Sequence, residues 1–255
     1  MDKGIMIRFI IPIAIGVLML GCDKNTGSEA DSQDARTLQW AAVAGDVPLV
    51  KRLIDQGANI NEVDSHRRTT ALGWAASVGN EEIVDILIAH GADVNKACPL
   101  YYASETGNLA IVRKLLDNGA DPNRFRLGSG GAPSALLAAA RRGHLEIVRL
   151  LVERGADIVS CAEGEAPLLE AAVYGHAKVV DYLLSQHVDV NIADEGGRTS
   201  LYLAAMKGNE ETARVLLAHG ANLNAKTKTG DTPIQVARRN GHESVVSLLE
   251  QSGGD

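Results

Sequence analysis

Aromatic residues are scarce in this chain of 255 residues, at 4% of the total, with two tryptophans and two phenylalanines. A large apolar ligand pocket is usually lined by such side chains, so their scarcity speaks against one. The chain also lacks a Gly-x-x-x-x-Gly-Lys phosphate loop, a Gly-x-Ser-x-Gly nucleophile motif and a His-Glu-x-x-His metal motif. We therefore expect a protein that is not an enzyme, with no catalytic residues and no cofactor.

Basic residues are also fewer than acidic ones. Lysine and arginine number 25 against 32 aspartates and glutamates, which gives a formal net charge of −7. Binding to nucleic acid needs a basic face, so this balance argues against a nucleic-acid partner. It leaves basic patches on other proteins as plausible partners.

Titratable residues show no pattern typical of a metal site. None of the seven histidines has the close His-x-x-x-His spacing that a helix would need to hold a metal. Glu165 and Glu170 flank Ala166-Pro167-Leu168, and we interpret them as carboxylates on a solvated helix face. We predict no metal ligands.

A short unit recurs along the chain. In residues 194–225 an apolar segment opens with Arg198-Thr199-Ser200-Leu201 and ends at Gly208-Asn209, and a second segment ends at His219-Gly220-Ala221. The first glycine recurs at intervals of 34, 28, 36, 32, 33 and 33 residues, as Gly45, Gly79, Gly107, Gly143, Gly175, Gly208 and Gly241.

This period and these motifs resemble the ankyrin repeat, a unit of a β-turn and two antiparallel helices. The resemblance predicts an all-α solenoid of about seven helix-turn-helix repeats with short β-hairpin fingers. The repeats are expected at about residues 36–63, 64–95, 96–123, 124–158, 159–191, 192–225 and 226–251, within a domain of residues 36–251. The first and last copies should act as caps, since their outer faces meet water.

Two of the three cysteines fall in equivalent regions of this array. Cys98 and Cys161 are two repeats apart, about 20 Å for helices stacked at the usual spacing. A disulfide needs Cα atoms within about 7 Å, so we expect both residues to remain thiols.

The third cysteine follows an apolar N-terminal run. Residues 9–20 are apolar after Lys3 and Arg8, and they are too few for an ordinary membrane-spanning helix but suit a secretory signal. The run ends in Met19-Leu20-Gly21-Cys22, which resembles a bacterial lipobox, although methionine replaces the usual leucine. The alternatives are an uncleaved N-terminal anchor and an ordinary signal peptide.

The lipobox resemblance implies a signal peptide over residues 1–21, lipidation of Cys22 and a flexible tether through residue 35. The tether prediction is supported by composition, because residues 23–35 contain no apolar residue larger than alanine. The lipobox resemblance further implies a lipid-anchored protein of the bacterial cell envelope that faces the periplasm. Asp23 after the cysteine favours the inner membrane.

In the ankyrin family, ligands are touched by the fingertips and by the two residues before the helix-ending glycine. Trp40 and Trp74 lie three places ahead of such pairs, and we expect both to pack mainly in the core, whereas Tyr174 is the better interface residue. Carried over by position, the candidate protein-binding residues in these pairs are Ser77, Val78, Glu105, Thr106, Arg141, Arg142, Tyr174, Met206 and Lys207.

The finger of the fourth repeat is long and basic. Arg124, Phe125 and Arg126 precede a Gly-Ser stretch, beside a third repeat whose finger is mostly missing. This loop could be a contact arm or a tolerated insertion, because surface loops lengthen at little cost. We include the three residues among the candidate protein-binding residues.

These features together predict a module that binds another protein and is a monomer when unbound. The expected role is to support or protect an envelope protein. The alternative is an immunity protein that neutralises a toxic effector, for example a phospholipase, in the periplasm.

Overall fold

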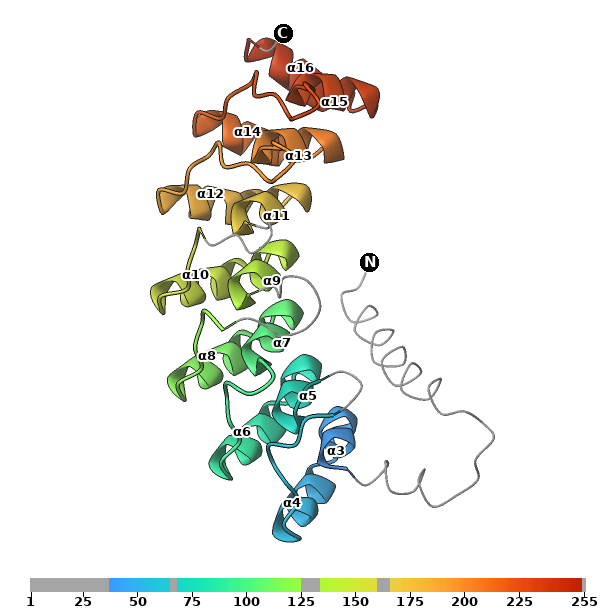
Figure 1. Cartoon of the computed structure of the whole chain (residues 1–255), viewed down its shortest axis with the longest axis vertical. Helices are drawn as coiled ribbons and strands as arrows, with labels where there is room; N and C mark the ends of the chain where they lie inside the picture. The colour runs from blue at the N-terminus through green and yellow to red at the C-terminus, as the bar shows by residue number, and fades with distance from the viewer. Residues whose placement is uncertain (1–36, 65–67, 125–133, 160–165, 254–255) are drawn as a thin grey trace, which may run out of the picture. The chain divides into compact units, whose positions relative to one another are not determined.

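The structure, a computed structural model, describes residues 37–64, 68–124, 134–159 and 166–253 (Figure 1). The segments predicted as a signal peptide and a tether lie outside these ranges, and so do Cys22, Phe125, Arg126, Cys161 and Glu165. Contacts divide the chain into two compact units, Met1–Asp93 and Val94–Asp255.

The described residues of the first unit form two helix pairs. Its helices are α3 (Leu38–Ala44), α4 (Val47–Asp55), α5 (Ala71–Val78) and α6 (Glu81–Ala89). The first helices of the two pairs, α3 and α5, pack against each other, and so do the second helices, α4 and α6.

The part of the second unit that the structure describes forms five helix pairs, which follow one another in chain order (Figure 1). Its helices are α7 (Pro99–Thr106), α8 (Leu109–Asp117), α9 (Ala135–Arg142), α10 (Leu145–Glu153), α11 (Pro167–Val173), α12 (Ala177–Ser185), α13 (Ser200–Lys207), α14 (Glu210–Ala218), α15 (Pro233–Arg239) and α16 (Glu243–Gln251). The prediction of an all-α repeat fold is confirmed.

The fingers contribute little β-structure in the part of the chain that is described. Pairing there is limited to one isolated antiparallel bridge between Ala193 and Thr199, in the finger before α13. The N–H of Lys228 in the next finger donates to the carbonyl of Gly196 at 2.9 Å, which joins these two fingers.

Most of the described first helices begin and end at residues suited to those positions; α7 and α11 instead follow Cys98 and Ala166, which make no side-chain cap. The hydroxyl before a first helix accepts a hydrogen bond from the third backbone N–H of the helix, as an N-cap does. This occurs at Thr37, Thr70, Ser134, Thr199 and Thr232. The first helices end before glycines with positive φ, such as Gly143 at 75°, where a side chain would be strained.

Helices of seven to nine residues are too short to be stable alone, so packing between repeats must stabilise them. The first helices bury alanines, which allow close approach; Ala41 and Ala75 in the first unit are fully buried. The second helices supply larger side chains, such as Ile111 and Leu216 in the second unit, which are also fully buried.

Asparagine side chains connect the loops of successive repeats. Asn123 shows the pattern: its Nδ2 donates to the carbonyl of Gly155 at 2.9 Å, and its Oδ1 accepts from the N–H of Asp157 at 2.7 Å. Asn61 and Asn95 make the same pair of bonds, each to the following repeat of its own unit. We call this arrangement the asparagine tie.

The last repeat has the features of a cap, as predicted. Arg238 occupies the position of the fully buried Ala205, and its side chain is exposed at the end of α15. Its Nη2 lies 2.6 Å from Oε1 of Glu250 in α16. A charged pair therefore covers the surface that in earlier repeats packs against a further copy.

Candidate protein-binding surface

The ends of the first helices are held by side chains of the following repeat. His144 and His176 lie against Gly107 and Gly143, so close that a Cβ on either glycine would come within 2.5 Å of the imidazole ring. Nε2 of His176 is 2.9 Å from the carbonyl oxygen of Arg141. Because a carbonyl oxygen only accepts, this nitrogen must carry the proton.

Elsewhere in the second unit the same position is filled by another histidine, His242, and by an asparagine, Asn209. Nε2 of His242 contacts the carbonyl oxygen of Met206 at 3.1 Å, and Nδ2 of Asn209 donates to the carbonyls of Ala172 and Val173 at 2.9 Å each. Histidine and asparagine thus fix the backbone at the helix ends. The side chains there project from a rigid support.

Burial perturbs one of these histidines. Desolvation lowers the pKa of His144, and the nearby His176 and Arg142 lower it further, against the raising effect of the hydrogen bond to the Glu105 carbonyl. The pKa falls because the charged imidazolium loses water on burial. His144 therefore favours its neutral form in the folded protein.

In the first unit the helix ends are apolar. Trp40 at the start of α3 is 37% exposed, so the expectation that it packs mainly in the core is wrong. Trp74 on α5 is half-buried, and its Nε1 donates to Oδ2 of Asp64 at 3.0 Å. Val78 is also 37% exposed, while Ser77 is half-buried and its hydroxyl donates to the carbonyl of Trp74.

In the second unit the helix ends carry charges that pair between repeats. Nη2 of Arg142 is 3.0 Å from Oε1 of Glu105, and both side chains are at least one-third exposed. Nε of Arg141 is 2.6 Å from Oε2 of Glu170, and these side chains are only 29% and 16% exposed. Glu170 is therefore not the solvated carboxylate that we predicted.

The pairing also changes the interpretation of the two arginines. Both were expected as surface contacts, but Arg141 is half-buried and bonded to Glu170, whereas Arg142 is exposed. The side chain of Arg142 is therefore more accessible to a partner than that of Arg141. Sequence spacing could not distinguish the exposure of the two arginines, because the burial of adjacent residues at a helix end depends on their contacts with the neighbouring repeats.

The remaining predicted residues differ in exposure. Tyr174 at the end of α11 is 56% exposed, and its ring stacks on that of His176 with centroids 6.5 Å apart. Thr106, Arg124 and Lys207 are exposed, and Met206 is half-buried. The helix ends of this unit thus present the aromatic ring of Tyr174 together with basic residues, such as Arg142 and Lys207, and the acidic Glu105.

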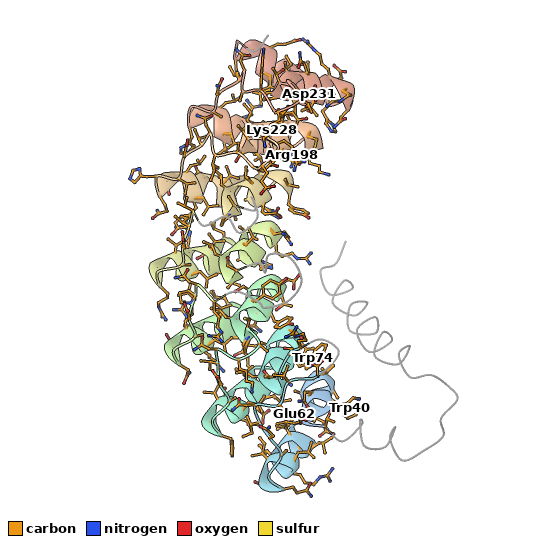
Figure 2. The ribbon with its side chains drawn as sticks, in the orientation of Figure 1. Trp40, Glu62, Trp74, Arg198, Lys228 and Asp231 are labelled. Atoms are coloured by element: carbon orange, nitrogen blue, oxygen red, sulfur yellow. The ribbon has the colours of Figure 1, made fainter. Side chains whose placement is uncertain are left out.

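Arg239 takes part in a pair that the sequence did not suggest. Its guanidinium contacts both carboxylate oxygens of Asp231, at 3.3 and 3.1 Å, and this bond raises the pKa of the arginine. In the preceding finger, Nε of Arg198 lies 2.6 Å from Oδ2 of Asp194. Figure 2 shows Arg198, Lys228 and Asp231 around the fingers of the last two repeats.

Neither a metal site nor a membrane-spanning helix is found among the described residues. Those residues contain no group of three or more histidine, cysteine, aspartate or glutamate side chains that could hold a metal ion. No described helix has the length and apolarity needed to cross a bilayer.

Comparisons with known proteins agree with this architecture. A family model described as ankyrin repeats (3 copies) matches residues 38–126, 128–194 and 186–255. Among solved structures, the human ASB11 ankyrin repeat domain is similar, with 29% sequence identity and a TM-score of 0.76. That match covers 86% of this chain and 98% of the other. No curated protein matches.

Proposed function

This chain belongs to the ankyrin-repeat family, and from that premise we propose that it is a lipid-anchored, non-enzymatic receptor for one protein of the bacterial envelope. Ankyrin repeats are protein–protein interaction modules and typical non-enzymatic scaffolds. Beyond this general property of the family, the proposal specifies the binding surface, the lipid anchor and the role of this chain in the envelope.

The exposed side chain of Tyr174 on a fixed backbone is the observation that supports this surface. Tyrosine is a favoured interface residue because it covers a large area with few rotatable bonds. Asn209 holds the carbonyl of the preceding residue, Val173, and His176 stacks on the ring. A partner would therefore bind a pre-ordered side chain, which lowers the entropy lost on association.

The anchor is proposed from the sequence around Cys22. A lipobox cysteine carries more than one acyl chain, and two or more chains hold a protein stably on a bilayer. The tether of residues 23–35 would separate the repeats from the membrane surface, on its periplasmic side. In this position the repeats can bind an envelope protein and support or protect it.

Capture after crosslinking in living cells tests the surface. We would compare the full chain with its Tyr174→Ala and Val159→Ala variants, because Val159 is similarly exposed at 52% but lies in a loop beyond α10. We expect one partner with the parent and Val159→Ala, and at least about a tenfold loss with Tyr174→Ala. Equal recovery from all three proteins would contradict the role of this surface.

The identity of the captured partner separates the two roles. A resident envelope protein whose abundance falls when this chain is deleted would support the proposal. A toxin delivered by another cell would favour the immunity alternative.

The anchor has its own test. Cells fed an alkyne-labelled fatty acid should label the parent chain and not its Cys22→Ser variant, which should leave the membrane fraction. Labelling of the variant would contradict acylation at Cys22.

A further inference from the structure

Three successive first helices of the second unit end in exposed side chains at equivalent positions. These are Arg142 at the end of α9, Tyr174 after α11 and Lys207 at the end of α13, and each stands directly before a glycine with positive φ. α9 packs on α11 and α11 packs on α13, and Figure 1 shows the three helices in this order. We call Arg142, Tyr174 and Lys207 the helix-end row.

Hydrogen bonds between repeats fix the backbone beneath the helix-end row. The carbonyl just before each row residue accepts a hydrogen bond from a side chain of the following repeat. The donors are His176, Asn209 and His242, and the acceptors are the carbonyls of Arg141, Val173 and Met206. The row residues therefore follow the spacing of packed helices, about 8–10 Å from one repeat to the next.

Positive charge on the helix-end row is a local feature of the second unit. The described residues of this unit contain sixteen basic and sixteen acidic side chains, so the unit is neutral overall. Both charged members of the row are nevertheless basic, and both are exposed. Lys207 forms no ion pair with a described residue. The row thus carries basic groups on either side of an aromatic ring.

Two carboxylates lie near the helix-end row, and each has a basic partner. Glu105 accepts from Nη2 of Arg142 at 3.0 Å, but it belongs to the repeat before Arg142, whereas Tyr174 belongs to the repeat after. Glu170 is bonded to Arg141 at 2.6 Å and is largely covered. A guanidinium has five N–H donors, so Arg142 can also donate to a carboxylate of a partner.

The period of the helix-end row matches that of one extended conformation. A polyproline II segment has three residues per turn and rises about 3.1 Å per residue, so every third side chain points the same way at intervals of about 9.3 Å. Tyr174 is 56% exposed, with its ring stacked on that of His176. Aromatic surfaces of this kind bind proline in such segments.

We propose that the helix-end row binds a polyproline II segment of the partner protein in which two acidic residues flank a proline, each three positions from it. The carboxylates would pair with Arg142 and Lys207, and the proline would lie on the ring of Tyr174. A β-strand would not serve, because its period of two turns the middle side chain to the opposite face. This inference rests on the proposed protein-binding function and names the chemistry of the partner.

Fluorescence anisotropy of dye-labelled peptides, titrated with the full chain in a neutral detergent, measures this binding. The test peptide has glutamates at both ends of a seven-residue segment whose other residues are prolines. A charge probe has lysines in place of the glutamates. A register probe of the same composition moves one glutamate inward by one position, which turns its side chain by about 120°.

We expect the test peptide to bind with a dissociation constant at least about tenfold lower than that of the charge probe, and severalfold lower than that of the register probe. Tyr174→Ala and Lys207→Glu should each weaken its binding about tenfold or more. Glu105→Gln should strengthen it about two- to threefold, because it removes a carboxylate that competes for Arg142.

Lys178→Glu is the matched control for Lys207→Glu. Lys178 is an exposed lysine at the start of α12, in the same repeat as Tyr174 but on the second helix. The same reversal of charge there should change the affinity by less than about twofold at 0.15 M salt, where charges more than about 8 Å away are screened. Circular dichroism verifies that each variant is folded.

Three results would overturn the inference: no anisotropy change with up to about 1 mM protein, equal binding of the test peptide and either probe, or equal losses from Lys178→Glu and Lys207→Glu. Loss of the cellular partner with Tyr174→Ala, without any peptide binding, would reject this inference and leave the proposed function standing. Equal recovery of that partner from the parent and Tyr174→Ala would instead reject the proposed function, whatever the peptides do.

Discussion

Replacing Gly143 by alanine should destabilise the second unit by about 2–4 kcal/mol. Gly143 has a φ of 75°, a conformation that costs an L-residue roughly 1–2 kcal/mol. Its new Cβ would also lie 2.4 Å from Nδ1 of His176, so the imidazole must move. Moving it breaks the Nε2 contact with the carbonyl of Arg141, a loss of roughly 1–2 kcal/mol.

Gly155→Ala is the matched control for this substitution. Gly155 has a φ of 83°, but nothing lies within 4 Å of the position that its Cβ would take. It should therefore lose only the backbone contribution of roughly 1–2 kcal/mol. The difference between the two variants isolates the contact between His176 and the helix end.

Urea unfolding followed by far-ultraviolet circular dichroism measures both variants. The double variant Gly143→Ala with His176→Ala completes the test, since removal of the ring removes the clash. We expect it to be less destabilised than the sum of the single variants by about 1 kcal/mol. Equal losses for the two glycines, or strict additivity in the double variant, would refute the role of the histidine.

Three other predictions concern single contacts in the second unit. His144→Asn should flatten the pH dependence of the unfolding free energy, measured between pH 7.5 and 5. Because the folded pKa of His144 is lowered, the contribution of this residue to stability is complete above about pH 6.5 and is lost as the pH falls below that value. Arg141→Ala should lower stability by about 1–3 kcal/mol because it leaves the mostly buried Glu170 unpaired, whereas Arg142→Ala, at an exposed pair, should lower it by less than about 1 kcal/mol in the same urea assay. Val159→Asn should raise the thermal midpoint and stabilise by about 0.5–1.5 kcal/mol, since it would restore the asparagine tie to the next repeat; an unchanged midpoint in calorimetry would contradict this.

The helices could be predicted from the sequence because their signals are local and repeated. Thr199 and Gly208 mark the two ends of α13, and a hydroxyl N-cap and a glycine with positive φ act within one turn of the chain. In the fifth repeat, His187 stands where the other loops have glycine. His187 does adopt a positive φ, of 63°, at the place where other repeats use glycine.

The character of the candidate site was less predictable, because it depends on contacts between repeats. Trp40 and Trp74 occupy equivalent positions, yet Trp40 is exposed and Trp74 is fixed by a carboxylate ten residues earlier. The pairing of Arg141 with Glu170 spans 29 residues. Periodicity predicts which positions are adjacent, but which side chains meet there is decided by their length and charge.

The junction between the fourth and fifth repeats shows how one local change can be offset elsewhere. Val159 stands where an asparagine would form the tie, and His187 replaces the glycine whose carbonyl the tie would reach. The Val159 N–H still donates to Oδ1 of Asp157 at 3.0 Å, as Asn123 does to Asp121, so the loop keeps its shape without the cross-link.

Other contacts join these two repeats on both sides of the junction. Arg141 pairs with Glu170 between the first helices, and the guanidinium of Arg149 on α10 lies 4.6 Å from the ring centroid of Tyr182 on α12. A cation over an aromatic ring contributes about 0.5–1 kcal/mol at an exposed site, similar to the lost hydrogen bonds. These contacts supplement the direct packing of α9 on α11 and of α10 on α12, and the contact of His176 with the carbonyl of Arg141, so the junction keeps its helices together without the asparagine tie.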